Sequence, residues 1–313
     1  MAALELHIKE LKYTRLYAGN EDQFNRRPRL SSLLALFKPN PTPPYDPDIP
    51  EGYNAIDYKI FLVLRNFLQS DSTLSLLDAS ERVVNVFPYK YADLRQLISV
   101  CFEIAQQIPH YHPSHQKLVK LLCITGRSAH HFEKPRQRNP TASSSHYRIS
   151  EFYERVAEAT IDYQFDLGAD DVDPARYVNY QAFLSLIMDG GFWVPTSRAV
   201  LAVMNRTFDE SHEKETSDIR DAWIMGAAQW ILWSGQSLLR LHLDPIGKLR
   251  HKGTPIQNID VIITTKPITL QTWHRWTFEF RKAAESDEYG KECRDVAKRA
   301  ADLMEALEKA MLK

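Results

Sequence analysis

The spacing of apolar residues is the feature that most constrains what this chain can fold into. From Tyr53 onward, apolar side chains recur every three to four positions, as in Ile56, Ile60, Val63 and Leu64. This period places them on one face of an α-helix. The pattern predicts two helices between Tyr53 and Pro88, followed by helices at about 93–108, 113–125, 149–167, 174–189, 196–207, 218–243, 270–285 and 291–312.

Glycine usage supports the same fold class. The chain has 11 glycines in 313 residues, roughly half of the average usage of about 7%. Few glycines mean few tight turns, which disfavours a fold made of many short strands. We therefore predict an all-α protein, either a multi-helix bundle or a short array of antiparallel helix pairs.

A cluster of prolines divides the chain near its N-terminus. Residues 39–50 contain Pro39, Pro41, Pro43, Pro44, Pro47 and Pro50, and proline removes a backbone donor and disfavours the α conformation of the residue before it. We predict an N-terminal arm at 1–38, an extended linker at 39–52 and one helical domain at 53–313. The arm carries a short amphipathic pattern, and we expect it to dock on the body or on a partner. A basic, serine-rich stretch at about 126–148 is predicted to be a mobile loop.

Charge and cysteine content limit the partners and the compartment. The formal net charge is −1, from 39 basic and 40 acidic residues, so no global field favours nucleic acid or an anionic membrane as a partner. No apolar run approaches the roughly 18 residues that read as a membrane span. The three cysteines are far apart and show no metal-binding spacing. We expect a cytoplasmic protein, with the nucleus as a second compatible compartment.

The usual catalytic motifs are missing from the sequence. It has no glycine-rich phosphate loop, no G-x-S-x-G motif and no Glu-x-x-His pair. We therefore assign no catalytic residue, no metal and no cofactor, and favour a non-enzymatic protein without excluding an enzyme. Asp170 and Asp171 could suggest a magnesium-dependent terpene cyclase. However, Asp173 followed by Pro174 is typical of a helix N-cap with proline in the first turn, which is the interpretation we prefer.

A ridge of carboxylates is the first candidate for partner binding. Four acidic residues follow one another at four-residue intervals on one face of the helix predicted at 149–167, and the neighbouring basic stretch could lie across them or bind the same partner. The alternative is an ordinary solvated helix face. The candidate partner-binding residues are Glu154, Glu158, Asp162, Asp166, Arg136 and Arg138.

Tryptophans near the C-terminus give a candidate ligand site. Large aromatic rings alternate with small residues along the helix predicted at 218–243, where small residues would let another helix approach closely. Such a stripe can be core, or it can wall a pocket for a small apolar ligand. The candidate ligand-binding residues are Trp230, Trp233, Gln236, Trp273 and Trp276.

Three aromatic blocks carry a resemblance to a known family. They are Tyr180–Leu184, the Ala-Ala-x-Trp-Ile-x-Trp block at 227–233 and the Leu-x-x-Trp-x-x-Trp block at 270–276. In this order they resemble a fungal, helical family of domains of unknown function, over about residues 53–313. The resemblance implies a fungal, cytosolic, helical protein and no activity. Our leading hypothesis is a non-catalytic interaction or scaffold protein. The alternative is a small-molecule-binding protein or a cofactor-free enzyme of fungal specialised metabolism.

Overall fold

The computed structural model describes residues 3–8, 49–50, 53–87, 94–127, 156, 167, 173–190, 197–243 and 268–311. Over these residues the chain forms helices and no strand, which confirms the all-α prediction. The helices are α1 (Ala55–Phe67), α2 (Leu76–Asn85), α3 (Leu94–Ala105), α4 (Ser114–Arg127), α6 (Pro174–Asp189), α7 (Ser197–Asp209), α8 (Ser217–Leu243), α11 (Leu270–Glu285) and α12 (Lys291–Met311).

Some predicted elements fall largely outside the described residues. Of the helix predicted at 149–167, only Val156 and Leu167 are described, and Val156 is helical and buried. Helix α4 extends to Arg127, and the rest of the predicted basic loop lies outside the described residues. The described part of the arm is residues 3–8.

Several helices begin where a side chain can cap them. The side chains of Asn54, Ser75 and Thr269 accept hydrogen bonds from backbone N–H groups in the first turns of α1, α2 and α11. Asp173 does the same for Ala175 at the start of α6, with Pro174 in the first turn. The predicted cap at Asp173 is therefore confirmed, and its carboxylate satisfies a donor that the helix itself leaves open.

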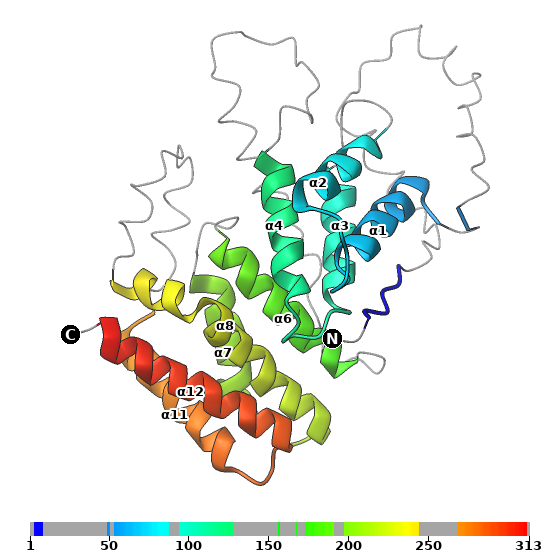
Figure 1. The fold of residues 1–313 in the computed structure, drawn as a ribbon. Helices are drawn as coiled ribbons and strands as arrows, with labels where there is room; N and C mark the ends of the chain where they lie inside the picture. Colours follow the sequence, from blue (N-terminus) through cyan, green and yellow to red (C-terminus); the bar gives the residue numbers. More distant parts are fainter. Residues whose placement is uncertain are drawn as a thin grey trace, which may run out of the picture.

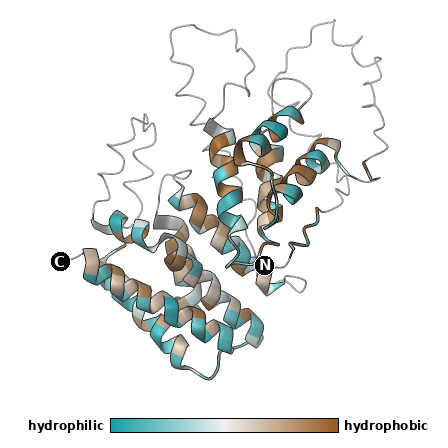
Figure 2. Ribbon diagram, viewed as in Figure 1, coloured by the Kyte–Doolittle hydropathy of each residue, from teal (hydrophilic) through white to brown (hydrophobic). Residues whose placement is uncertain are grey.

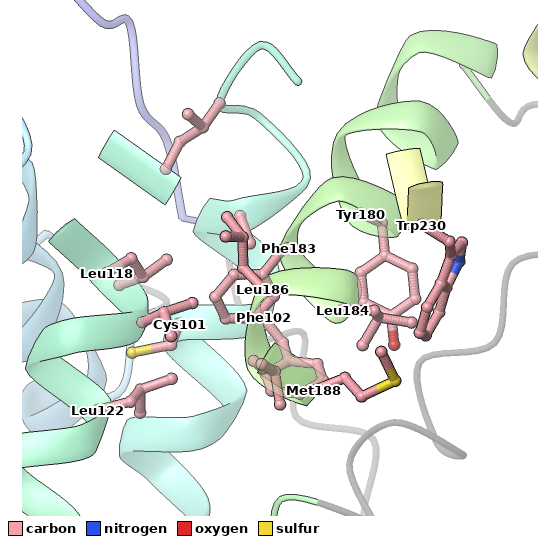
Figure 3. Packing of buried hydrophobic residues seen from close by; sticks show 14 of the residues in the cluster. Cys101, Phe102, Leu118, Leu122, Tyr180, Phe183, Leu184, Leu186, Met188 and Trp230 are labelled. Carbon is pink, nitrogen blue, oxygen red and sulfur yellow. The ribbon is translucent and has the colours of Figure 1, made fainter. Parts of the chain in front are cut away.

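Helix α6 is the centre of the molecule, with α1–α4 on one side and α7, α8, α11 and α12 on the other (Figure 1). Every residue of α6 from Tyr177 to Met188 is buried. A helix covered on all sides needs no polar face, and α6 indeed has apolar residues around its whole circumference. Figure 3 shows Cys101 and Leu118 on one side of α6 and Trp230 on the other. The ring of Phe102 meets that of Phe183 edge to face, at 5.2 Å.

Helices α6 and α8 run parallel and in close contact. Trp230 Nε1 donates to Gln181 Oε1 at 2.8 Å, and Ser234 Oγ donates to the Ser185 carbonyl at 2.5 Å. A Cβ added at Gly226 would lie 2.4 Å from Cε1 of Tyr177. The small residues of α8 therefore permit the close approach that the sequence predicted.

Helix α12 packs antiparallel to α11, and both pack beside α8. The buried residues of α12 include Val296, Ala300 and Met304, whereas its outer face is largely hydrophilic (Figure 2). Arg281 of α11 donates to both carboxylate oxygens of Glu305 on α12, at 3.0 and 2.9 Å. None of the described helices combines the length and the apolar composition needed to cross a bilayer.

Candidate functional site

The N-terminal segment, residues 3–8, is held on the body in an extended form. Its side chains alternate along residues 3–8: Leu6 is only 4% exposed, Leu4 and Ile8 are partly buried, and Glu5 and His7 are exposed. This period of two is the pattern of an extended chain with one face against a core. The arm thus docks on the body through a strand-like segment rather than through a helix.

Gln69, just beyond the end of α1, binds the backbone of Leu4 through two hydrogen bonds. Its Oε1 accepts from the Leu4 N–H at 2.9 Å, and its Nε2 donates to the Leu4 carbonyl at 3.1 Å. The same Nε2 donates to the Arg65 carbonyl at 3.0 Å, which satisfies an acceptor in the last turn of α1. The carboxamide therefore takes the place of a neighbouring β-strand, which would exchange the same pair of hydrogen bonds.

Gln107 repeats this arrangement at the end of α3. Its Oε1 accepts from the His7 N–H at 2.8 Å, and its Nε2 donates to the His7 carbonyl at 2.7 Å. The same nitrogen donates to the Glu103 carbonyl, four residues back in α3, at 3.2 Å. Two glutamines in equivalent positions after two helices therefore bind the backbone of one extended segment.

The two glutamines hold opposite edges of this segment. In an extended chain, the backbone polar groups of successive residues point alternately to the two sides. Leu4 and His7 are three positions apart, so their N–H and carbonyl groups point in opposite directions. The segment is therefore clamped between the ends of α1 and α3, and we call this place the two-glutamine groove, defined by Gln69 and Gln107.

Contacts that do not involve the segment hold the backbone next to both glutamines. At the end of α1, Ser114 Oγ donates to the Leu68 carbonyl, and Lys117 Nζ donates to the Gln69 carbonyl at 2.9 Å. At the end of α3, Asn179 Nδ2 of α6 donates to the Gln106 carbonyl at 2.9 Å. Both glutamines therefore project from backbone that α4 and α6 already hold in place, which reduces the entropy lost on binding.

The predicted acidic ridge and its basic partners, Arg136 and Arg138, lie outside the described residues. This applies to Glu154, Glu158, Asp162 and Asp166, and also to Asp170 and Asp171. Their role in partner binding stays a prediction.

The predicted tryptophan site is divided between core and surface. Trp230, Trp273 and Trp276 are fully buried, Trp233 is partly buried, and Gln236 is exposed. The three buried rings belong to one continuous hydrophobic cluster. Whereas Trp230 Nε1 has its acceptor on Gln181, the Nε1 atoms of Trp273 and Trp276 are buried and have no hydrogen-bond partner in the described part of the chain.

Trp223 forms a separate polar and aromatic cluster at the turn from α7 to α8. The guanidinium of Arg206 lies 4.6 Å from the centre of its ring, and His212 stacks on it at 5.2 Å. Trp223 Nε1 donates to Glu215 Oε2 at 2.8 Å, and His212 Nδ1 lies 2.9 Å from that same oxygen, without hydrogen-bond geometry. These contacts fold the turn onto α8 and so fix the start of that helix.

Three histidines, His110, His112 and His115, lie just before α4 and in its first turn, and they form no metal site with other described residues. In the described ranges, no group of three or more His, Cys, Asp and Glu side chains is arranged to hold a metal ion. His115 is completely buried, and its Nε2 lies 2.9 Å from the Ile108 carbonyl. Burial lowers the pKa of His115 to about 3, because a charged imidazolium would lose its hydration there.

Sequence reasoning missed both Gln69 and Gln107. Nothing local distinguishes these glutamines, since their function depends on a segment that lies 65 and 100 positions away. A signal was present in the arm itself, where Leu4, Leu6 and Ile8 alternate with polar residues. That period of two predicts an extended segment with one apolar face.

A family model described as "Protein of unknown function (DUF3632)" matches residues 99–280. The match covers more than half of the chain and includes Gln107, α6 and α8, but not the arm or Gln69. Comparisons with curated proteins and with solved structures gave no match.

Proposed function

The chain belongs to the DUF3632 family of proteins of unknown function, and we propose that it is a non-catalytic interaction protein. In this proposal the two-glutamine groove binds an extended segment of a partner protein, and residues 3–8 occupy the groove until the partner arrives. The observation that carries the proposal is the duplicated backbone clamp made by Gln69 and Gln107.

The chemistry of the groove defines the kind of segment that fits. Four of its hydrogen bonds go to backbone atoms, which any residue except proline provides. Side-chain selection comes from the apolar face, where Leu6 is buried and Leu4 and Ile8 are partly buried. A partner segment therefore needs apolar residues at three alternate positions and no proline at the two clamped positions. Backbone bonds would provide affinity and side chains specificity, as in other strand-binding proteins.

The resident segment sets the affinity that a partner must exceed. Residues 9–48 join residues 3–8 covalently to the body, so residues 3–8 compete with any free segment as an intramolecular ligand, at an effective concentration on the order of millimolar. A free peptide identical to the arm would therefore exchange poorly with it. A partner segment must bind the groove more tightly, or be present at a high local concentration.

The first test uses the full chain with its arm released. We expect Leu6→Asp to eject the arm, because a carboxylate would replace a buried apolar side chain. A fluorescent peptide with the sequence of residues 2–9 should then bind with a dissociation constant on the order of 10 µM, measured by anisotropy. Gln107→Ala in the same background should weaken binding about tenfold. A correctly folded Leu6→Asp chain that leaves the peptide free at millimolar concentration would refute the proposal.

The second test asks whether a partner can displace the arm. Octapeptides selected on the Leu6→Asp chain should share apolar residues at three alternate positions. The tightest of them, added to the wild-type chain, should remove the hydrogen-exchange protection of the Leu4 and His7 amides. If every selected peptide leaves this protection intact, the arm is a permanent part of the fold and the proposed exchange is wrong.

A second candidate function is small-molecule binding, or cofactor-free catalysis, beside the tryptophans. The observation that favours it is the pair of buried Nε1 atoms on Trp273 and Trp276 that have no acceptor among the described residues. A ligand carrying a carbonyl or ether oxygen could satisfy them. Native mass spectrometry of protein isolated gently from its own source tests this candidate. A retained mass of a few hundred daltons would support it, and a bare chain with unchanged tryptophan fluorescence across a panel of apolar ligands would contradict it.

A further inference from the structure

A cleft of about 360 Å³ opens between the docked arm and α1. From the arm it is lined by Leu6, His7 and Ile8, and from the body by Tyr53, Tyr58 and Phe61 among others. This volume is at the lower end of the range of about 300 to 1,000 Å³ found for small-molecule sites. The cleft is separate from the tryptophan cluster, and it exists only while the arm is docked.

Three of the described residues that line the cleft are aromatic. The ring centroids of Tyr53 and Tyr58 are 5.4 Å apart with a tilt of 56°, and those of Tyr58 and Phe61 are 6.1 Å apart with a tilt of 44°. Tilted pairs at such distances present both ring faces and ring edges, which are the surfaces on which a further aromatic ring packs favourably.

Arg65 supplies a positive charge to the cleft, and its guanidinium lies 5.6 Å from the centre of the Phe61 ring. Among the described lining residues it is the one with a permanent charge, and none of them is a carboxylate. A guanidinium held against an aromatic wall can bind a planar carboxylate through two parallel hydrogen bonds, which a neutral group of the same shape cannot match.

From these observations we infer that the cleft binds a small aromatic carboxylate. Its ring packs against Tyr53, Tyr58 and Phe61, and its carboxylate pairs with Arg65. Because the arm forms the opposite wall, the ligand binds only the docked state. It therefore stabilises that state by mass action, and the arm becomes harder to displace as the ligand concentration rises. The inference depends on the docked arm and goes beyond the proposed exchange with a partner segment.

The test uses the full wild-type chain with phenylacetate and its neutral analogue phenylacetamide. We expect phenylacetate to bind with a dissociation constant on the order of 0.1 mM, as suits a ligand of this size, and the amide to bind at least about tenfold more weakly. Titration is followed by ligand-observed NMR and by the Tyr53 and Tyr58 ring signals. Equal binding of acid and amide, or no binding of either at 5 mM, which is about fifty times the expected constant, would overturn the inference.

Two variants separate the ligand site from the peptide site. Arg65→Gln should abolish the preference for the acid, whereas Arg82→Gln, an exposed arginine on α2, should preserve it. Leu6→Asp should weaken phenylacetate at least about tenfold by removing the arm side of the cleft, even where the same variant captures the free peptide. Unchanged phenylacetate affinity in Arg65→Gln, or in Leu6→Asp with a released arm, would refute this assignment whatever the outcome of the peptide tests.

Discussion

The docked arm and the α8–α11–α12 bundle are stabilised in different ways. In the bundle, helices meet through large rings and close-packed small residues, and Trp230, Trp273, Trp276 and Phe280 are fully buried. Residues 3–8 contribute one buried side chain, Leu6, and their backbone is hydrogen-bonded to Gln69 and Gln107. Beside the arm there is also open volume.

This difference indicates where the molecule can move. Where large side chains are buried, local unfolding has a high free energy, and the region unfolds only with the rest of the protein. A segment held by a few hydrogen bonds and one apolar side chain can detach locally. We therefore expect the bundle to open only when the whole protein unfolds, and the arm to open on its own. Variants in the bundle and in the arm test this difference.

The largest effect should come from the bundle. Phe280→Ala removes a fully buried ring that meets Phe208 edge to face at 5.1 Å. We expect a loss of about 3–5 kcal/mol in the free energy of unfolding, measured by urea denaturation. The exposed Phe278, 65% accessible on the same helix, provides the control, and its replacement by Ala should cost less than about 0.5 kcal/mol. Similar costs at both positions would contradict the packing described for α11.

Leu6→Ala should act locally on the arm. Loss of this buried side chain should destabilise docking by about 2–3 kcal/mol, because Leu6 is the only fully buried anchor among residues 3–8. Hydrogen exchange of the Leu4 and His7 amides should accelerate by roughly a hundredfold, since each 1.4 kcal/mol is a factor of ten. The urea midpoint of the body should stay nearly unchanged. A fall in that midpoint as large as the one caused by Phe280→Ala would show that the arm and body unfold together.

Acid should lower the free energy of unfolding through His115, which lies at the start of α4. Its pKa is lowered to about 3 by burial, so below pH 6.5 the unfolded chain takes up a proton that the folded chain does not. Stability is therefore highest above pH 6.5 and falls as the pH decreases toward 3. Between pH 7 and pH 5 the loss should be about 2 kcal/mol, at 1.36 kcal/mol per pH unit.

The variant that tests this prediction is His115→Gln. Replacement of His115 should flatten the slope of stability against pH, as measured from urea midpoints at pH 7 and pH 5. An unchanged slope in His115→Gln would mean that the acid sensitivity has another source.

The smallest effects should come from the glutamine clamps. Gln107→Ala removes two hydrogen bonds to His7, and we expect it to cost about 1–2 kcal/mol of docking. Gln107→Glu keeps an acceptor for the His7 N–H but loses the donor to its carbonyl, so it should cost at least as much. The exposed Gln116 of α4 is the control, and its replacement by Ala should leave exchange of the His7 amide unchanged. If both Gln107 variants matched the wild type, the clamp would not hold the arm.

Much of the fold could be predicted because the signals are local. The start of α6 follows from Asp173 and Pro174, and the close approach of another helix to α8 follows from Gly226 and Ser234 among large rings. The parallel direction of α6 and α8 could not be predicted, since it depends on how α7 connects them. The candidate tryptophan site illustrates the same limit: spacing put the rings on one face, but only packing decided that Trp230 is buried and Gln236 exposed.

The sequence by itself determined the helical class, most helix positions and the composition of the core. These depend on periodicity, caps and proline, which act over a few residues and need no knowledge of the rest of the chain. Only the tertiary structure decided where the arm docks, because the bonds of Gln69 and Gln107 join residues 65 and 100 positions apart. A glutamine side chain can bind a backbone in this way only when the fold brings an extended segment beside it. No local sequence pattern indicates such a long-range contact.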